Sequence, residues 1–265
     1  MKNLLYTLSS SNMYWMLLFF SSCDGLQTAS STKANDWTRD STAHFIMYAQ
    51  QGVRSEKNLK EIGQQLEYTQ GDLLHMLNER TPQRLQVYFL KDRETLTSYT
   101  GFPANGYTDT EKGIIYLVDK APFNLAFRHE IMHALSWRLW GPPQAYWLSE
   151  GIAVFASGAC GGYPLHALAQ TIQQEGKLVS FQSLTDTFDF KAVEPNLQAA
   201  SMVKYIYDTY GVAKLKRFWK TGWQNTGQVI GISPDELQKE WLDYIKQPEY
   251  HIAVNWDNIH TSGCE

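Results

Sequence analysis

The sequence lacks the features of a nucleic-acid-binding, membrane-spanning or repetitive protein. Its 23 lysine and arginine residues are outnumbered by 27 aspartate and glutamate residues, so the net charge of −4 gives no basic footprint for nucleic acid. The apolar run at residues 13–20 is too short to cross a bilayer. No internal repeat and no heptad pattern occur. The 265 residues, 43% of them hydrophobic, are enough to bury a full core, and one unit of two lobes fits this length better than two independent domains.

The most informative segment is His129-Glu130-Ile131-Met132-His133, an H-E-x-x-H run within a helical pattern. Two histidines four residues apart project from the same face of a helix, so both imidazoles can reach one metal ion while Glu130 lies beside it. A chain of this composition contains such a run by chance with a probability of about 0.01. The pattern predicts the histidine ligands and the general base of a zinc peptidase.

The helix that carries this run is predicted over residues 123–140 and is apolar on nearly every side, which indicates that it is buried. Two imidazoles and a carboxylate without partners would cost several kcal/mol in such a place. Zinc would supply the partners. The alternative is a pair of core histidines that bond to backbone carbonyls, with Glu130 exposed.

A third ligand is predicted from the geometry of a helical hairpin. Gly141-Pro142-Pro143 ends the first helix, and a second helix is expected over residues 144–157. At 1.5 Å per residue, His133 and Glu150 both lie roughly 9 to 10 Å from the turn, so Glu150 should face the histidines. Cys160, His166 and Glu175 lie farther along the chain and are less well placed to be the third ligand. The alternative for Glu150 is a surface carboxylate on an amphipathic helix.

With these residues assembled, the chain resembles a known family. H-E-x-x-H followed by Tyr146-Trp147-Leu148-Ser149-Glu150-Gly151-Ile152-Ala153 looks like the gluzincin clan of metallopeptidases, and most like its bacterial peptidase MA-like branch. The likeness spans roughly residues 45–246, although only the two metal-binding segments are specific. The resemblance implies that His129, His133 and Glu150 bind zinc and that Glu130 activates water.

The resemblance also implies an α+β fold of the zincin type. A small N-terminal lobe of strands and a helix would precede the zinc helix, and a mainly helical C-terminal lobe would follow it. Strands are predicted at residues 44–49, 85–90 and 113–118, and helices at 56–79, 93–99, 165–175, 198–210, 212–219 and 234–246. In gluzincins the strand before the zinc helix lines the cleft, where an extended peptide can add to it. Residues 113–118 are therefore either such an edge strand or an ordinary buried strand.

The N-terminus has the pattern of an export signal. Lys2 precedes the apolar run, which ends in Phe20-Ser21-Ser22-Cys23, similar to a bacterial lipobox although Phe20 stands where an aliphatic residue is usual. We predict a signal peptide at residues 1–22, an acylated Cys23 that anchors the protein to a membrane of the cell envelope, and a flexible tether at 23–40. A secreted or periplasmic soluble protein with a cleaved signal, or an uncleaved segment, are the alternatives. The peptidase domain is predicted at 41–248 and a C-terminal tail at 249–265.

Export would place the cysteines in a compartment where disulfides can form. Setting Cys23 aside leaves Cys160 and Cys264, and disulfides persist outside the cytoplasm, so these two are expected to pair. The bond would hold the tail against the metal-binding lobe. The alternatives are a buried apolar Cys160 with a free Cys264, and Cys160 as a zinc ligand.

Two functions of different class remain open. The first is a zinc endopeptidase of the envelope that acts on a peptide or protein. The second is a catalytically weak or inactive binding module on the same scaffold. Gluzincins commonly use a Tyr or His of the C-terminal lobe to stabilise the oxyanion, and related chains have a tyrosine where Leu197 stands here. Tyr163, His166, Tyr205 and Tyr207 are the candidates to replace it. The intact Glu130 favours the first function.

Overall fold

The structure, a computed structural model, describes residues 37–119, 124–189, 191–262 and 264. All described residues belong to one compact unit, Asn35–Glu265. The predicted signal sequence, Cys23 and most of the predicted tether lie outside the described residues. Within the described part, no helix has the length and apolarity that a membrane crossing needs.

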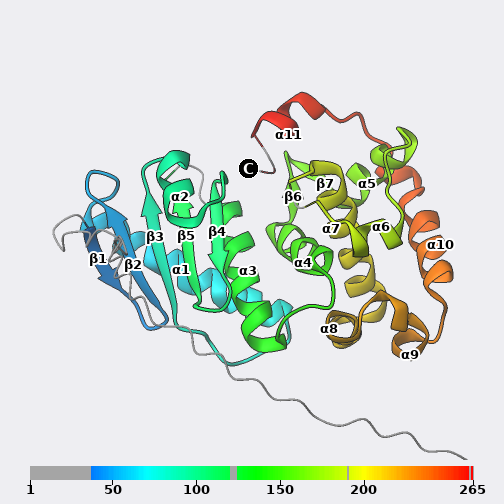
Figure 1. Cartoon of the computed structure of the whole chain (residues 1–265), viewed down its shortest axis with the longest axis horizontal. Coiled ribbons are helices and arrows are strands. Elements are labelled where there is room, and N and C mark those ends of the chain that lie inside the picture. Colours follow the sequence, from blue (N-terminus) through cyan, green and yellow to red (C-terminus); the bar gives the residue numbers. More distant parts are fainter. Residues whose placement is uncertain (1–36, 120–123, 190, 263, 265) are drawn as a thin grey trace, which may run out of the picture. The chain divides into compact units, whose positions relative to one another are not determined.

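A five-stranded sheet forms the N-terminal part of this unit (Figure 1). Its strands are β1 (Trp37–Ser41), β2 (Phe45–Gln50), β3 (Leu85–Leu90), β4 (Gly106–Asp109) and β5 (Ile114–Val118), in the order β1-β2-β3-β5-β4. β2, β3 and β5 run parallel, and the two outer strands are antiparallel to their neighbours. Phe45, Met47 and Ala49 alternate with less buried residues along β2, as expected of a strand with one face in the core.

Helices cover the apolar face of the sheet. α1 (Glu56–Met76) crosses behind the sheet in Figure 1, and α3 (Asn124–Trp140) packs beside β4 and β5. The short helix α2 (Arg93–Thr100) contacts β3 and β5 from the other face, where the ring of Tyr99 lies 6.1 Å from that of Tyr116. On that face, the strand register aligns Tyr48, Tyr88, Tyr116 and Tyr107 in one row across four strands. The rings of Tyr48 and Tyr88 stack with their centroids 4.6 Å apart, and such cross-strand aromatic pairs stabilise the register.

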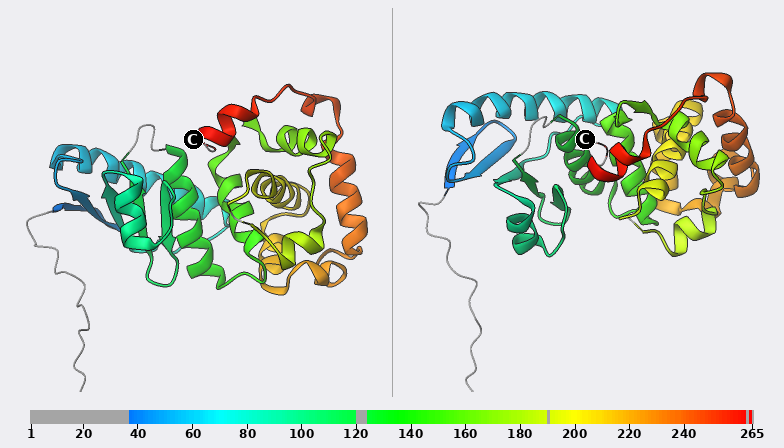
Figure 2. Two further views of the ribbon diagram at one scale, coloured as in Figure 1. Left: turned by 45° about the horizontal axis from the view of Figure 1, so that its top comes forward. Right: turned by 90° about the horizontal axis from the view of Figure 1, so that it is seen from above.

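The remainder of the chain is mainly helical. Its elements are α4 (Tyr146–Ser157), a hairpin of β6 (Ala159–Cys160) and β7 (Tyr163–Pro164), α5 (Leu165–Gln174), α6 (Phe181–Asp186), α7 (Val193–Tyr210), α8 (Val212–Thr221), η2 (Trp223–Asn225), α9 (Thr226–Ile230), α10 (Pro234–Ile245), η3 (Pro248–Tyr250) and α11 (Trp256–Ser262). α7 lies at the centre of this group in Figure 2. The described part is thus an α+β fold with a small N-terminal sheet and a helical C-terminal region.

Glycine allows α4 and α7 to approach closely. A Cβ atom on Gly151 would lie only 2.8 Å from the backbone oxygen of Ala199, so a side chain at this position would push the two helices apart. Gly151 directly follows Glu150. The helix that carries Glu150 is therefore fixed from behind by its contact with α7.

Three sequence-based expectations about the sheet change. β1 begins at Trp37, inside the segment predicted as tether to residue 40, because residues 37–41 pair with β2. β4 lies in a segment whose Gly, Pro and Asn residues suggest a loop. From the sequence, residues 113–118 are expected to form either an edge strand or a buried strand. Most of them form β5, which lies between β3 and β4 and is therefore the buried strand. The edge strand on this side of the sheet is β4.

The C-terminal segment is not a loose tail. Ile259 of α11 is fully buried among Val154, Leu165, Leu168, Leu197 and Ala200. The indole nitrogen of Trp256 donates to Glu175 Oε1 (2.8 Å). A disulfide joins Cys160, which follows α4, to Cys264, and their Cα atoms lie 4.1 Å apart. The covalent bond, the buried Ile259 and the hydrogen bond of Trp256 thus fasten the end of the chain to the helical region.

Candidate metal centre

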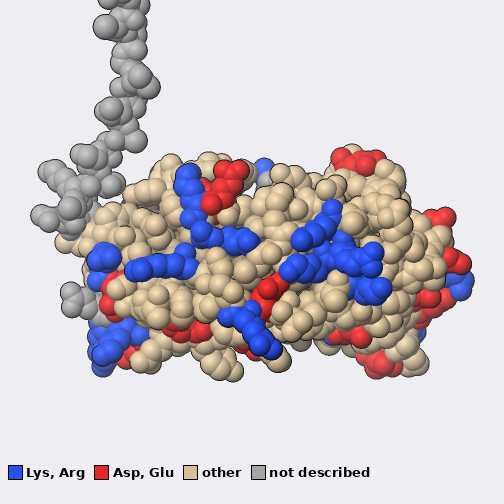
Figure 3. All heavy atoms as spheres, turned by 90° about the horizontal axis from the view of Figure 1, so that it is seen from below, with Lys and Arg blue, Asp and Glu red and all other residues tan. Residues whose placement is uncertain are grey.

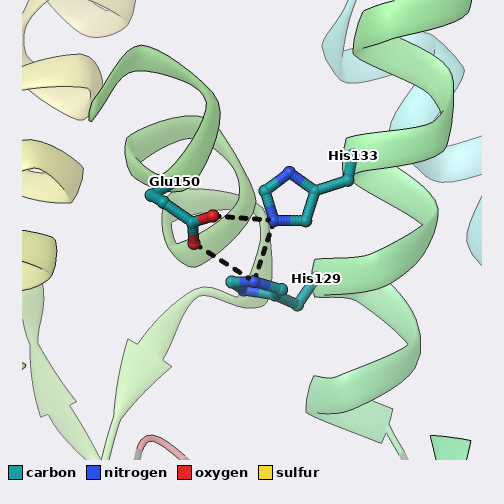
Figure 4. Close-up of side chains that lie close together, drawn as sticks. All are labelled: His129, His133 and Glu150. Atoms are coloured by element: carbon teal, nitrogen blue, oxygen red, sulfur yellow. Dashed lines mark hydrogen bonds and ion pairs between the residues drawn. The ribbon is translucent and has the colours of Figure 1, made fainter. Parts of the chain in front are cut away.

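The helical hairpin of α3 and α4 brings His129, His133 and Glu150 together (Figure 4). α3 ends at Trp140, and Gly141 then takes a φ of 81°, which suits glycine at the end of a helix. The indole of Trp219 donates to the Gly141 carbonyl (2.7 Å) and holds the turn. α4 returns antiparallel to α3, so the histidines on one helix face the glutamate on the other.

The three side chains point their ligand atoms at a common centre. His129 Nε2 and His133 Nε2 lie 3.1 Å apart. Glu150 Oε2 lies 3.6 Å from His129 Nε2, and Glu150 Oε1 lies 3.5 Å from His133 Nε2. Among the described residues this is the group of His, Cys, Asp or Glu side chains that could hold a metal ion. Cys160 is not part of it, since its sulfur is in the disulfide.

These separations fit a small divalent cation. Two ligand atoms bound to one zinc at about 2.1 Å in tetrahedral directions lie about 3.4 Å apart, close to the three observed separations. Two imidazoles and one carboxylate are also a common donor set of catalytic zinc sites, which keep a fourth position open. Without a metal, one of the two facing Nε2 atoms must carry a proton to make a hydrogen bond.

The charges in the group also favour a cation. Burial alone would raise the pKa of Glu150, but its interactions with the imidazoles of His133 and His129 hold that pKa well below its ordinary value. Glu150 is therefore an anion at neutral pH. His133 is buried at 8% exposure, which protects the centre from water on that side.

A serine and a tryptophan orient His133. Ser149 Oγ lies 3.0 Å from His133 Nδ1, and Trp137 Nε1 donates to the same oxygen (3.0 Å). The serine oxygen has two lone pairs and can accept both N–H groups. In that arrangement Nδ1 carries the proton of His133, and Nε2 presents its lone pair to the centre, as a metal ligand requires.

Glu130 lies beside this group and is held by the edge strand β4. Thr108 Oγ1 donates to Glu130 Oε2 (2.5 Å) and also lies 3.1 Å from the Glu130 carbonyl oxygen. Gly106 leaves room for the carboxylate, since a Cβ there would lie only 2.4 Å from Oε1. Glu130 is 7% exposed. Of the two carboxylate oxygens, Oε2 is the one that Thr108 bonds.

A scan of the sequence against models of known protein families finds no match, and a search of curated proteins finds no relative. The likeness of residues 129–133 and 146–153 to gluzincin motifs therefore stays a prediction. Gly106, Thr108, Ser149 and Trp137 are additional residues that the sequence alone did not single out.

The four candidates for oxyanion stabilisation have partners elsewhere. Tyr205 donates to Glu240 Oε2 (3.3 Å) and Tyr207 donates to the Met76 carbonyl (3.1 Å). Tyr163 Oη accepts from the Asn255 backbone (3.1 Å), and His166 Nδ1 lies 2.9 Å from Ser201 Oγ. Leu197 lies inside α7, which begins at Val193 and not at residue 198, and is fully buried. None of these residues contacts the triad through a described interaction.

His166 is expected to make the protein less stable in mild acid. Burial lowers the pKa of His166 to about 4, and Lys204 adds to the shift. The unfolded chain has a histidine pKa of about 6.5, so it binds the proton more readily than the folded chain. The stability is complete above pH 6.5 and falls toward pH 4, by about 2 kcal/mol between pH 7 and pH 5.

Denaturant unfolding at pH 7 and pH 5 measures this loss. His166→Gln should lower the free energy of unfolding at pH 7 but remove most of its pH dependence. His251→Gln, which changes an exposed histidine, should keep the dependence of the wild type. An equal slope in all three proteins would show that the pH dependence does not come from His166.

Proposed function

We propose that this protein is a zinc-dependent, endopeptidase-like hydrolase of peptide bonds with a zincin-like fold. The observation that carries the proposal is the tetrahedral spacing of His129 Nε2, His133 Nε2 and the Glu150 carboxylate, with Glu130 held next to them by β4. The sheet followed by a helical hairpin and a helical region supports the zincin-like assignment.

His129, His133 and Glu150 would hold the zinc, leaving a net charge of +1. When bound, zinc supplies Lewis-acid activation of water and of the scissile carbonyl. Ser149 and Trp137 keep the Nε2 lone pair of His133 directed at the metal. The base beside the metal distinguishes this arrangement from a purely structural metal site.

Glu130 is the residue that moves protons. Its Oε1 takes a proton from the attacking water and later delivers that proton to the leaving amine. Thr108 holds the other oxygen, so the carboxylate cannot rotate away between the two transfers. We expect the fixed position of the Glu130 carboxylate to contribute more to the rate of hydrolysis than any single additional contact would.

The edge strand β4 offers a place for the substrate. In the described sheet β4 pairs only with β5, so its outer backbone groups can bond an extended peptide. Gly106 and Thr108 of this strand contact Glu130, which places such a peptide next to the catalytic base. We infer a peptide or protein substrate bound in an extended conformation.

The direct test is zinc analysis together with turnover of a mixed peptide pool by the purified protein. Glu130→Gln should retain zinc and slow hydrolysis by a factor of about 10² to 10⁴, the usual contribution of general acid–base catalysis. Wild-type protein that holds zinc but cleaves nothing in the pool would reject the peptidase and support the second function, a binding module. The second function is favoured by the absence, among the described residues, of a Tyr or His contacting the triad from the helical region.

Gly106→Ala is expected to slow hydrolysis about 100-fold, because the added Cβ would displace the Glu130 carboxylate. The carboxylate is the end of a flexible side chain, so stability and zinc content should change little. Gly71→Ala is the matched control, since no atom lies within 4 Å of a Cβ at that position. Steady-state assays of both variants test the prediction, and full activity in Gly106→Ala would remove Gly106 from the catalytic apparatus.

We also propose an exported protein anchored to a membrane by acylation of Cys23. The disulfide between Cys160 and Cys264 supports a compartment outside the cytoplasm, where such bonds persist. Mass spectrometry of the mature N-terminus tests the anchor. A mature chain that begins at another residue would reject it.

A further inference from the structure

α8 has one apolar and one strongly basic side. Leu215, Phe218 and Trp219 are buried, and Trp219 packs edge-on against Trp140 of α3 with ring centroids 5.6 Å apart. The opposite side carries Lys216, Arg217 and Lys220. Because the apolar side is fixed against α3, the basic side must face outward.

Cations from two other parts of the fold continue this basic side. Lys216 Nζ and Trp140 Nε1 both bond Glu79 Oε1, at 2.5 and 3.1 Å, which joins α8 to the segment after α1. Exposed Arg80 directly follows Glu79. The guanidinium of Arg138, at the end of α3, lies 3.5 Å from the carbonyl oxygen of Arg84. We call the surface made by Arg80, Arg84, Arg138, Lys216, Arg217 and Lys220 the basic face.

The charge of the basic face is poorly compensated. Glu79 lies among its cations, and Lys216 together with Lys220 holds the pKa of Glu79 below its ordinary value. Arg80, Arg84, Arg138, Arg217 and Lys220 are exposed. Figure 3 shows lysine and arginine side chains gathered in the middle of the surface seen from the side where α8 lies. The net charge of −4 for the whole chain conceals this local excess.

We propose that the basic face docks on a membrane surface that carries anionic lipid headgroups. The exposed cations come from three separate elements and spread over a surface, an arrangement that suits a layer of phosphates rather than a single small anion. The inference does not depend on zinc or on hydrolysis.

A nucleic acid fits the basic face less well. Proteins that bind single strands usually place aromatic rings between their cations so that bases can stack on them. Here the rings next to the cations, Trp140 and Trp219, are buried at 3% and 1% exposure. The basic face therefore offers contacts to phosphate without contacts to bases.

The test measures binding of the full chain, with Cys23→Ser to prevent acylation, to vesicles of phosphatidylcholine with or without phosphatidylglycerol. Binding should require phosphatidylglycerol and weaken with added salt. Each lysine or arginine near an anionic surface contributes about fivefold in affinity, so Arg80→Gln, Arg84→Gln and Lys220→Gln together should weaken binding about a hundredfold. In the described part of the chain no hydrogen bond holds these three side chains, so the variant should fold.

The matched control replaces Lys204, Lys239 and Lys246 by glutamine. These lysines pair with Asp208 and Asp243 within α7 and at α10, and their loss changes the total charge by the same amount. The control should bind like the parent protein. Equal weakening in both triple variants, or equal binding to neutral vesicles, would overturn the proposal. Binding to an RNA homopolymer but not to anionic vesicles would overturn it in favour of a nucleic acid.

Discussion

Replacing His133 by alanine is expected to leave the protein unable to retain zinc. His133 Nε2 lies 3.1 Å from His129 Nε2 and 3.5 Å from Glu150 Oε1, so the substitution removes one of the three ligands that converge on the centre. Two remaining protein ligands are fewer than the three that catalytic zinc sites use. Hydrolysis should be lost with the metal.

Metal content after dialysis, measured by mass spectrometry, checks this expectation. The wild type and His75→Ala, which changes an exposed histidine of α1, should each keep one zinc per chain. Added zinc should raise the thermal midpoint of these two proteins but not that of His133→Ala, because only a ligand bound by the folded state stabilises it. Zinc retained at full stoichiometry by His133→Ala would exclude the triad as the metal site.

Removal of the disulfide is expected to have the largest effect on stability. The bond between Cys160 and Cys264 closes a loop with a sequence separation of 104. In the chain-entropy model a loop of this length is worth about 4.7 kcal/mol, and measured values are often lower. Cys264→Ser should therefore lower the free energy of unfolding by about 3 to 5 kcal/mol.

Denaturant unfolding with and without a reducing agent measures the contribution. The reductant should bring the wild type down to the stability of Cys264→Ser and leave the variant unchanged. Cys23→Ser is the matched control, because it removes a cysteine that is not in the bond. If Cys264→Ser is as stable as the wild type under oxidising conditions, the non-covalent contacts of Ile259 and Trp256 are enough to hold the C-terminal helix.

The triad could be predicted from the sequence because its geometry is local. The spacing of His129 and His133 follows from the helical repeat, and the Gly-Pro-Pro turn sets the level at which Glu150 lies. Ser149 adjoins Glu150 and could have been found from its position. The strands β2 and β3 of the five-stranded sheet, and the helices that pack against the sheet, were likewise predictable. Apolar residues alternate along these strands and recur with the helical period along the helices.

The residues around Glu130 were not predictable, since they come from a neighbouring element. Gly106 and Thr108 lie in a four-residue strand whose glycine, and the Pro103 and Asn105 before it, have the composition of a turn. Only its pairing with β5 makes this segment a strand. β1 was missed for a similar reason, because its polar residues pair with β2 at the margin of the sheet.

The hairpin of α3 and α4 has a consequence for the order in which the molecule assembles. All three donor side chains lie within residues 129–150, so bringing them together closes only a short loop. The disulfide joins positions 104 residues apart and needs the helical region to be in place. Contacts between residues close in the sequence form faster than contacts between distant ones. A metal ion stabilises the segment that supplies its ligands, which here is the hairpin of α3 and α4. If the triad binds zinc, as proposed, a nascent chain is therefore expected to capture the zinc before it closes its disulfide.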